Sequence, residues 1–497
     1  MMHRHRHSAF ALMAGIAAAM AGAVFTLLPG CKVSPDYSRP PLEVPGSYRS
    51  ATTQQAAPVN LSLQWWTLFG DADLNDLEAR AIYANQDLRA AMARVAQARA
   101  TVAVTRSQFF PLVTADPTVT RSRSAAGRNG SSATATEIRI PFDVSYEVDI
   151  WGRVARGVES SRATFRQSQN DFAVILQTMQ TDIAQDYFNL RLLDSQSDIL
   201  LREIEQFRLQ ENLEKIRIAA NIDNTLALSQ VEALLQASVA QEADVRRQRA
   251  ELEHAIAQLL GLAPSAFTIP PRVISLTVPT IPAGLPSDLL ARRPDVNEAE
   301  QALVAANANV GVAVANFYPT LTLTGAAGQQ SFDLQSIANW ESRFLSFGPN
   351  LSIPLFEGGK LTGNLRQAKA RYDELLATYR QSLLTAYREV EDSLSDLRLR
   401  AEAGAAQEKA VDAAREYLRL SNVQHAQGLI DSLQIIDADR TLLSNELTLE
   451  QIQAARLTST VLLIKSLGGG WDPRRPTAVL GGEVGAGATT APAPRLQ

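Results

Sequence analysis

The segment TEIRIPFDVSYEVD, residues 136–149, alternates between apolar and polar side chains over its whole length. The even positions from 138 to 148 are apolar, whereas the odd positions are mainly charged or polar. Because successive side chains of a β-strand point to opposite faces, this pattern predicts a strand with one apolar and one polar face. Pro141 is awkward in this run, because proline cannot donate a hydrogen bond to a neighbouring strand. A partner strand is expected at about residues 112–121, across a turn-rich stretch.

The same order of features returns in the second half of the chain. Gly152 and Leu260 each have a counterpart 207 residues later, Gly359 and Leu467 (359 − 152 = 467 − 260 = 207). This offset is too long for a solenoid repeat, so it indicates a duplication. The expected repeats span about residues 72–261 and 280–468, and the second repeat has expected strands at about 319–326 and 344–356. Outside them lie an N-terminal segment at 31–71, a linker at 262–279 and a C-terminal segment with a flexible tail at 469–497.

Each strand pair is followed by a long helical run. Residues 158–260 contain neither glycine nor proline, and residues 365–467 contain two glycines and no proline. Each run has one break, at Asn221 and at Gly428, and these breaks also lie 207 residues apart (428 − 221 = 207). Both residue types tolerate the left-handed backbone that ends a helix. Each repeat is therefore expected to end in a helical hairpin, with helices at about 153–220, 224–260, 360–427 and 431–467.

The N-terminus has the features of a secretory signal peptide, expected at residues 1–30. Arg4 and Arg6 precede an apolar stretch, and Cys31, the single cysteine of the chain, follows it. This order resembles a bacterial lipobox, in which the signal is cleaved before the cysteine and the cysteine is acylated. Lys32 stands where an Asp commonly retains such lipoproteins in the inner membrane, so the outer membrane is expected. The alternative is an uncleaved membrane anchor with an incidental cysteine.

The composition of the 497 residues excludes several classes of protein. The 47 Lys and Arg against 52 Asp and Glu give a net charge of −5, which indicates no general affinity for nucleic acid. The absence of any other cysteine and of a phosphate-binding loop excludes cysteine-based zinc sites, cysteine nucleophiles and P-loop nucleotide binding. His254 and His425 lie in helical runs without matched ligands and are expected in solvent. We therefore expect no enzymatic activity, metal or cofactor.

Four strands in one chain cannot close a barrel around an open lumen. The apolar-out, polar-in alternation and the outer-membrane address together favour a transmembrane barrel that several chains share. Two chains would fill the barrel with side chains, whereas three would leave a pore, and composition alone does not choose three copies over four. Hairpins from several chains would likewise form a tube. A plain coiled-coil spacer is the alternative, but it explains neither the duplication nor the strand pairs.

A series of motifs along the chain is similar to that of TolC-like outer-membrane efflux lipoproteins. In order, they are Cys31 with Pro35-Asp-Tyr37 and Arg39-Pro-Pro41, Trp65-Trp66 with Leu68-Phe69-Gly70, Arg292-Arg-Pro-Asp295, Pro354-Leu-Phe-Glu-Gly-Gly-Lys360, and Leu467-Gly-Gly-Gly-Trp471. The chain most resembles the NodT-type outer-membrane factors of tripartite drug pumps. The resemblance implies a mainly α, TolC-like homotrimer with a twelve-stranded β-barrel on a long α-helical barrel. Trp65-Trp66 would pack in an equatorial belt rather than at the membrane interface.

The resemblance also implies a function. The trimer would be the exit duct of a tripartite efflux system, passively exporting drugs or other small toxic compounds. An inner-membrane transporter of RND type would supply them through a periplasmic adaptor, and the duct would extend from the outer membrane into the periplasm. One alternative is a protein-secretion (type I) duct of the same fold. Another is a structural periplasmic coiled-coil lipoprotein.

Some family positions carry over to individual residues. Leu433 and Asp437 match the apolar and acidic positions of the periplasmic aperture, and they share a helix face because they are four residues apart. Three copies of the carboxylate would favour cations. Asp431 joins this set, with a helix N-cap as its alternative role, and the alternative for Asp437 is a salt bridge with Arg440.

Two further positions match the hairpin tips that meet the adaptor in related pumps. These are Asn221 and Gly428. Asn221 departs from the glycine that most members of the family have at this turn.

Overall fold

The computed structural model describes residues 33–41, 44–50, 62–123, 134–221, 225–273, 278–282, 284, 286 and 289–472. The chain divides into two compact units. The first comprises Met1–Pro41, Ala96–Gln167 and Ala299–Tyr379, and the second comprises Leu42–Val95, Ser168–Glu298 and Arg380–Gln497. Cys31 and the expected signal peptide lie outside the described residues.

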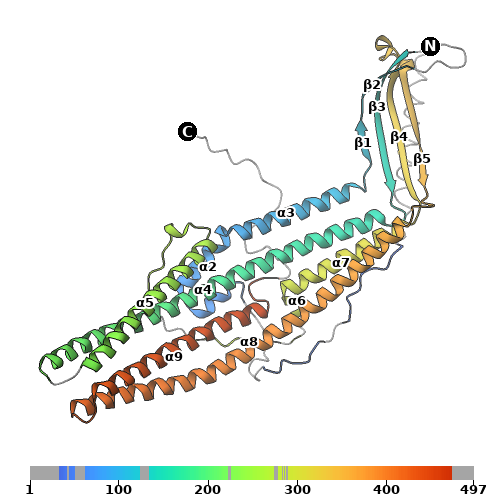
Figure 1. Ribbon diagram of the computed structural model, residues 1–497. Helices are drawn as coiled ribbons and strands as arrows, with labels where there is room; N and C mark the ends of the chain where they lie inside the picture. Colours follow the sequence, from blue (N-terminus) through green and yellow to red (C-terminus); the bar gives the residue numbers. More distant parts are fainter. Residues whose placement is uncertain are drawn as a thin grey trace. The chain divides into compact units, whose positions relative to one another are not determined.

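The first unit contains an antiparallel sheet (Figure 1). The strand order is β1-β3-β4-β5, and β2 pairs with β3 on the same flank as β1, in line after it. The strands are β1 (Leu112–Ala115), β2 (Thr118–Arg123), β3 (Thr134–Val148), β4 (Thr320–Ser331) and β5 (Arg343–Ser352). In the described part of the chain, neither β1, β2 nor β5 has a second strand neighbour, so the sheet has two open edges.

The segment expected as one strand at 112–121 is two strands, and the reason is Pro117. Proline has no N–H to donate, so the ladder with β3 stops after Ala115 and resumes at Thr118. The gap lies opposite Pro141 of β3, so both prolines fall where this flank is unpaired. On the other flank Pro141 faces Gly328, where an added Cβ would lie 2.1 Å from the Ile140 carbonyl oxygen.

The second strand pair also differs from expectation in its bounds. β4 continues to Ser331, beyond the expected end at 326, and β5 ends at Ser352 instead of 356. Pro354 follows the end of β5 and cannot extend the ladder.

Four long helices dominate the molecule. They are α4 (Arg153–Ala219), α5 (Thr225–Leu259), α8 (Lys360–Ala426) and α9 (Ser432–Ser466). α4 and α8 have 67 residues each, and α5 and α9 have 35 each. Both pairs start 207 residues apart (360 − 153 = 432 − 225 = 207). Among the described residues, no helix is both long and apolar enough to span a bilayer.

Shorter elements precede and separate the long ones. The α-helices are α2 (Ala72–Ala84), α3 (Gln86–Ser107), α6 (Leu289–Arg292) and α7 (Pro294–Ala315). The 3-10 turns are η2 (Trp65–Phe69), η3 (Pro264–Ala266), η5 (Leu334–Ser336) and η6 (Trp340–Ser342). α3 and α7 have 22 residues each and start 208 residues apart (294 − 86 = 208), so the duplication includes them.

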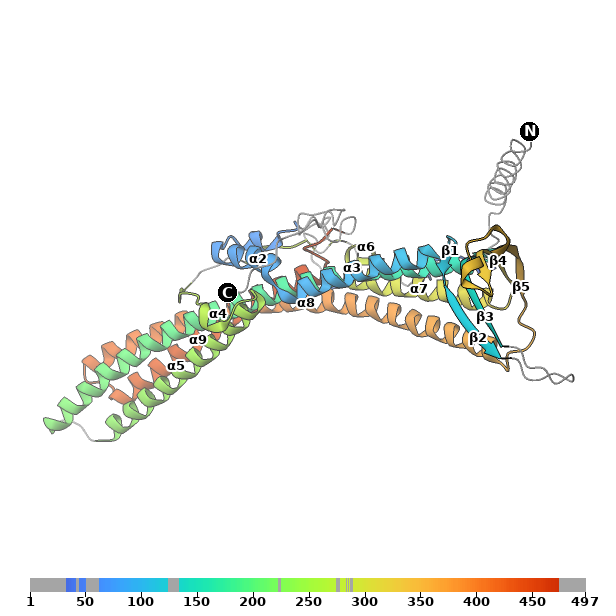
Figure 2. The ribbon, with the colours of Figure 1, turned by 90° about the horizontal axis from the view of Figure 1, so that it is seen from above.

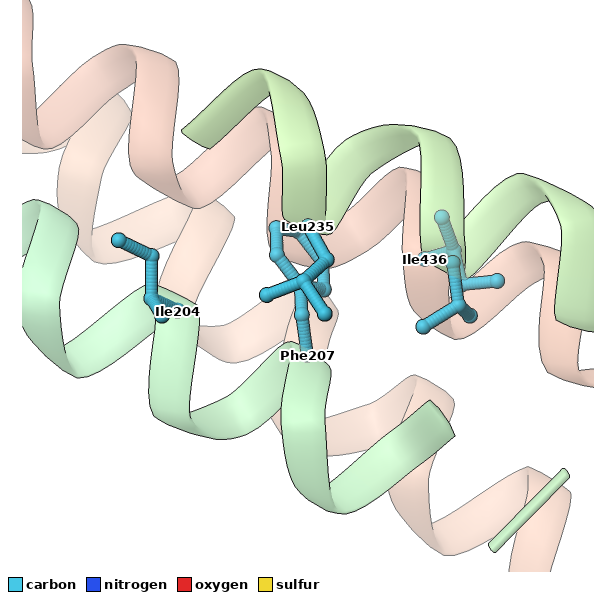
Figure 3. Close-up of a cluster of buried hydrophobic side chains, with 5 residues drawn as sticks. Ile204, Phe207, Leu235 and Ile436 are labelled. Atoms are coloured by element: carbon cyan, nitrogen blue, oxygen red, sulfur yellow. The ribbon is translucent and has the colours of Figure 1, made fainter. Parts of the chain in front are cut away.

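Within the second unit the long helices run side by side as two hairpins (Figures 1 and 2). A cluster of buried side chains joins the first hairpin to α9 (Figure 3). It consists of Ile204 and Phe207 of α4, Val231 and Leu235 of α5, and Ile436 of α9. Complete burial of such side chains contributes about 1.5–3 kcal/mol each, so this cluster is a principal contact of the hairpins.

Candidate functional site

The second hairpin turns at Gly428, next to the expected aperture residues. Gly428 has a φ of 72°, and its N–H donates to the carbonyl of His425 at 2.9 Å. The N–H of Leu429 donates to Gln424 at 3.0 Å, so the turn satisfies carbonyls that the end of α8 leaves open. Asp431 then caps α9, accepting a hydrogen bond from the N–H of Gln434 at 3.3 Å. The alternative role expected for Asp431, a helix N-cap, is therefore present.

The first hairpin turns at Asn221, which is the only described non-glycine residue with positive φ, at 58°. Its N–H donates to the carbonyl of Ile218 at 2.9 Å. Asparagine tolerates this left-handed conformation better than other non-glycine residues. Both residues expected at the tips, Asn221 and Gly428, are therefore exposed left-handed residues at equivalent positions.

Leu433 and Asp437, the expected aperture residues, have different surroundings. Leu433 is half-buried and packs against the cluster that contains Phe207 and Ile436. Asp437 is exposed, and in the described part of the chain it makes no ion pair with Arg440, the partner that its alternative role requires. One side chain therefore stabilises the hairpin contact, while the other leaves its carboxylate open to solvent.

A row of buried carboxyl groups lies beside this position, and the sequence analysis did not identify it. Glu203 of α4 lies near Asp439 and Glu446 of α9, and burial, together with these two charges, raises the pKa of Glu203 to about 7. Burial also raises the pKa of Asp439 to about 6. Glu450 continues the row, and its pKa is raised mainly by burial and partly by Glu446. The spacing of seven and then four residues along α9 places these acids on one helix face and is the signal that could have found them.

His425 connects the ends of α4 and α8 instead of lying in solvent as expected. Its Nδ1 lies 3.1 Å from the carbonyl oxygen of Ile430, and its Nε2 lies 3.1 Å from a guanidinium nitrogen of Arg217. When Nδ1 donates to the carbonyl, Nε2 is free to accept from Arg217. Arg217 also lies 3.6 Å from the buried carboxylate of Glu214. His254, in contrast, is exposed as expected.

The middle of the second unit brings two of the quoted motifs together. Trp471 donates from its indole to the carbonyl of Arg292, and Arg293 donates to the carbonyl of Ser466 at 3.1 Å. An added Cβ on Gly468, which has a φ of 75°, would lie 2.4 Å from the Arg292 carbonyl. The glycines before Trp471 thus permit a close approach of two backbone segments.

Trp65 and Trp66 are buried in the same unit. Their rings lie 6.0 Å apart in an edge arrangement, and the Trp65 indole reaches the side chain of Gln180 at 3.4 Å. Packing within the helical unit, and not an exposed position at a membrane interface, is therefore their role.

The N-terminal segment is fixed to the first unit by charged contacts. Arg39 makes two hydrogen bonds to Glu300 of α7, at 2.7 and 2.6 Å, and Tyr37 adds a third at 3.4 Å. Arg156 of α4 is 1% exposed and donates to the backbone and side chain of Ser34. Burial, followed by the charge of Glu300, raises the pKa of Tyr37. Bidentate pairs of this kind hold an extended segment in one register.

The sequence matches the outer membrane efflux protein family over residues 78–262 and 285–469. The two matched ranges start 207 residues apart (285 − 78 = 207), the offset of the duplication. The cation efflux system protein CusC of Escherichia coli is 30% identical over 450 residues, which cover 89% of this chain and 96% of that protein. The solvent efflux pump outer membrane protein SrpC of Pseudomonas putida is 31% identical over 458 residues, with coverage of 90% and 96%.

Solved structures agree with these relatives. The outer-membrane channel OprN superposes with a TM-score of 0.84 at 29% identity, covering 88% of this chain and 99% of that chain. A CusC crystal structure superposes with a TM-score of 0.79 at 28% identity, covering 88% and 100%. The expected TolC-like fold class is confirmed, and the relatives are channel and transport proteins. The chain therefore belongs to the outer membrane efflux protein family and is an outer-membrane exit duct of an efflux system.

Proposed function

We propose that three copies of the chain close into one duct that passively conducts small toxic organic compounds out of the cell. The observation that carries the proposal is the sheet with two open edges and an exposed apolar face. Four strand positions per chain give twelve in a trimer (3 × 4 = 12), enough for a barrel with an open pore. Unpaired edges buried in lipid would leave N–H and C=O groups without partners, so closure between copies satisfies both edges.

The exposed side chains of the sheet fit a lipid environment. Phe347 is 86% exposed and Leu345 is 75% exposed, although both are large and apolar. Both lie on the same face of β5, because alternate residues of a strand share a face. Contact with lipid gives these side chains the apolar surroundings that water does not.

We place the lipid anchor at Cys31. The contacts of Ser34 with Arg156 hold the N-terminal segment near the first turn of α4, five residues after β3 ends. Three residues of extended chain reach at most about 11 Å, so Cys31 is tethered near the helical end of the sheet. An acyl chain there would enter the membrane leaflet that the barrel spans.

The hairpin tips and the aperture complete the proposed duct. We assign the periplasmic aperture to Leu433, Asp437 and Asp431, and the contact with a periplasmic adaptor to Asn221 and Gly428. The open carboxylate of Asp437 and the exposed left-handed turns support these assignments. An inner-membrane transporter, of RND type, would provide the energy and select the compounds.

The test compares two substitutions on neighbouring residues of β5. Phe347→Arg places a charge on the apolar face, at an expected cost of about 2–4 kcal/mol at mid-membrane. Ser346→Arg places the same charge on the opposite face, toward the lumen. We expect the native protein and Ser346→Arg to be heat-modifiable trimers that conduct ions in planar bilayers, and Phe347→Arg to fail to insert. A monomeric native protein without conductance would refute the duct, whereas equal behaviour of the two variants would refute the assigned faces.

Substrates are tested in the cell. Deletion of the gene should sensitise the host to antibiotics, dyes or organic solvents, and plasmid-borne native protein should restore growth. Sensitivity to metal salts alone would replace organic compounds with cations, the substrates that the name of CusC gives for that relative. Loss of a secreted protein without any drug phenotype would instead favour the type I secretion duct.

A further inference from the structure

The two faces of the sheet differ in the sign of their charge. Paired residues of adjacent antiparallel strands lie on the same face, so the register assigns every strand residue to a face. Among the described strand residues, the face with Phe142 and Phe347 has three charged side chains, all of them arginine: Arg121, Arg123 and Arg343. The opposite face has four charged side chains, of which three are acids, at Glu137, Asp143 and Glu147, and the fourth is Arg139. Acids are therefore confined to one face of the strands.

The three arginines also share one end of the sheet. β2 ends at Arg123 and β5 begins at Arg343, both at the end where strands connect directly to strands (Figure 1). The helices α3, α4, α7 and α8 adjoin the opposite end. The arginines thus form a basic margin along the apolar face, on the side away from the helices.

Each strand changes from apolar to polar on approaching this margin. On β2 the change is from Val119 to Arg121, and on β5 from Leu345 to Arg343. The neighbouring positions on β3 and β4 change in the same direction, from Ile138 to Thr136 and from Ala327 to Gln329. All three arginines are exposed, and the guanidinium of Arg343 lies 4.1 Å from the ring centre of Trp340. An apolar band that ends in arginine and tryptophan is typical of a membrane interface.

We propose that Arg121, Arg123 and Arg343 bind the phosphate groups of the anionic glycolipid in the outer leaflet. This inference rests on the proposed function only for the direction of the helices, which places the strand-to-strand end outside the cell. Neutral side chains such as Gln329 would suffice for contact with water, whereas a margin with arginines and no acid is complementary to anions. The guanidinium group binds phosphate through two parallel hydrogen bonds, which lysine does not provide.

The open edges concentrate this margin at the seams between copies. β2 lies on one edge of the sheet and β5 on the other, so in a closed ring β5 of one copy meets β1 and β2 of the next. Arg343 of one copy would then approach Arg121 and Arg123 of the next. A glycolipid with two phosphates would bridge such a seam and offset the repulsion between the arginines.

The test measures lipid retention by the full-length protein in mild detergent, using native mass spectrometry. The probes are bisphosphorylated lipid A, the same lipid A without phosphates, cardiolipin and inorganic phosphate. The native protein should retain bisphosphorylated lipid A at least fivefold more than the dephosphorylated form, in the presence of millimolar inorganic phosphate. The triple variant Arg121→Gln, Arg123→Gln, Arg343→Gln should lose this preference. The matched control, Arg139→Gln, removes one arginine from the opposite face at the same end of the sheet and should keep it.

Each remaining outcome contradicts the inference in a defined way. Equal retention of the dephosphorylated lipid by the native protein refutes it without any variant, so a triple variant that fails to assemble does not leave the question open. Displacement by inorganic phosphate would assign the arginines to free anions, and preference for cardiolipin would place the margin in the inner leaflet. Loss of conductance or of the trimer in the native protein would refute the duct, and this result is read separately from the lipid bound per chain.

Discussion

The two helical hairpins have the same backbone dimensions and different side-chain chemistry. α4 and α8 have equal lengths, as do α5 and α9, and their turns occupy equivalent positions. At positions 207 residues apart, the first and second hairpins have Phe207 and Ala414, Glu203 and Ala410, Gln230 and Asp437, and Asn221 and Gly428. The buried aromatic ring and the buried acid of the long helix belong to the first hairpin, and the open acid at the tip belongs to the second.

This difference indicates which properties of the duplicated unit are fixed by geometry. Helix length and turn position depend on where glycine, proline and capping residues occur, and these are the landmarks that the two halves share. The faces depend on what each helix packs against, and there the halves differ. Leu226 of α5 is exposed, whereas its equivalent, Leu433 of α9, packs into the buried cluster. Substitutions at equivalent positions therefore test whether the two hairpins have separate roles.

The largest effect is expected from Phe207→Ala. The ring is buried among α4, α5 and α9, so its loss leaves a cavity and costs about 3–5 kcal/mol. The equivalent residue of the second hairpin is already alanine, so no equal loss is available there. The apparent melting temperature of the purified trimer measures the effect. Leu209→Ala, on an exposed position of the same helix, is the control and should change it little.

A smaller effect is expected at the two turns. Gly428→Ala imposes a left-handed backbone on alanine, which costs about 1–2 kcal/mol, although no atom within 4 Å obstructs the new methyl group. Asn221→Gly relieves such strain and should leave the first turn equally or more stable. Amide hydrogen exchange near each turn measures these changes locally. Faster exchange around residue 221 than around 428 in Gly428→Ala would contradict the assignment of strain.

The fold could be predicted from the sequence further than the site could. Strand alternation at 136–149 and the glycine-free helical runs are local properties of the backbone, so they were sufficient for the TolC-like fold class. The interruption at Pro117 was also local, but a single alternating stretch was assumed there. The burial of Glu203 and the contact of His425 with Arg217 depend on which helix faces meet, and a sequence without structure does not determine that.

A pH dependence is expected from Glu203, which has no acidic equivalent in the second hairpin. Burial and the charges of Asp439 and Glu446 raise the folded-state pKa of Glu203 from 4.5 to about 7. The folded protein therefore holds the proton more tightly, so this group's stability contribution is full below pH 4.5 and is lost as the pH rises through 7. Glu203→Gln should remove this slope and raise the melting temperature at pH 8, by about 1 kcal/mol or less because solvent screens the group in part. Glu205→Gln, an exposed acid on the same helix, should leave the slope unchanged.

The smallest effect in energy concerns the aperture, where the comparison is between Asp437 and its equivalent, Gln230. If Asp437 lines the narrowest part of the duct, Asp437→Ala should raise single-channel conductance about twofold and weaken cation preference, equivalent to about 0.4 kcal/mol. Gln230→Ala is the matched control and should change neither quantity. Leu433→Ala should add to the conductance, but Leu433 also packs against the buried cluster. A gain from Leu433→Ala alone would therefore report loosened helices, so the charge test depends on Asp437→Ala. Unchanged conductance and ion selectivity in that variant would remove Asp437 from the aperture and leave the open carboxylate as surface charge.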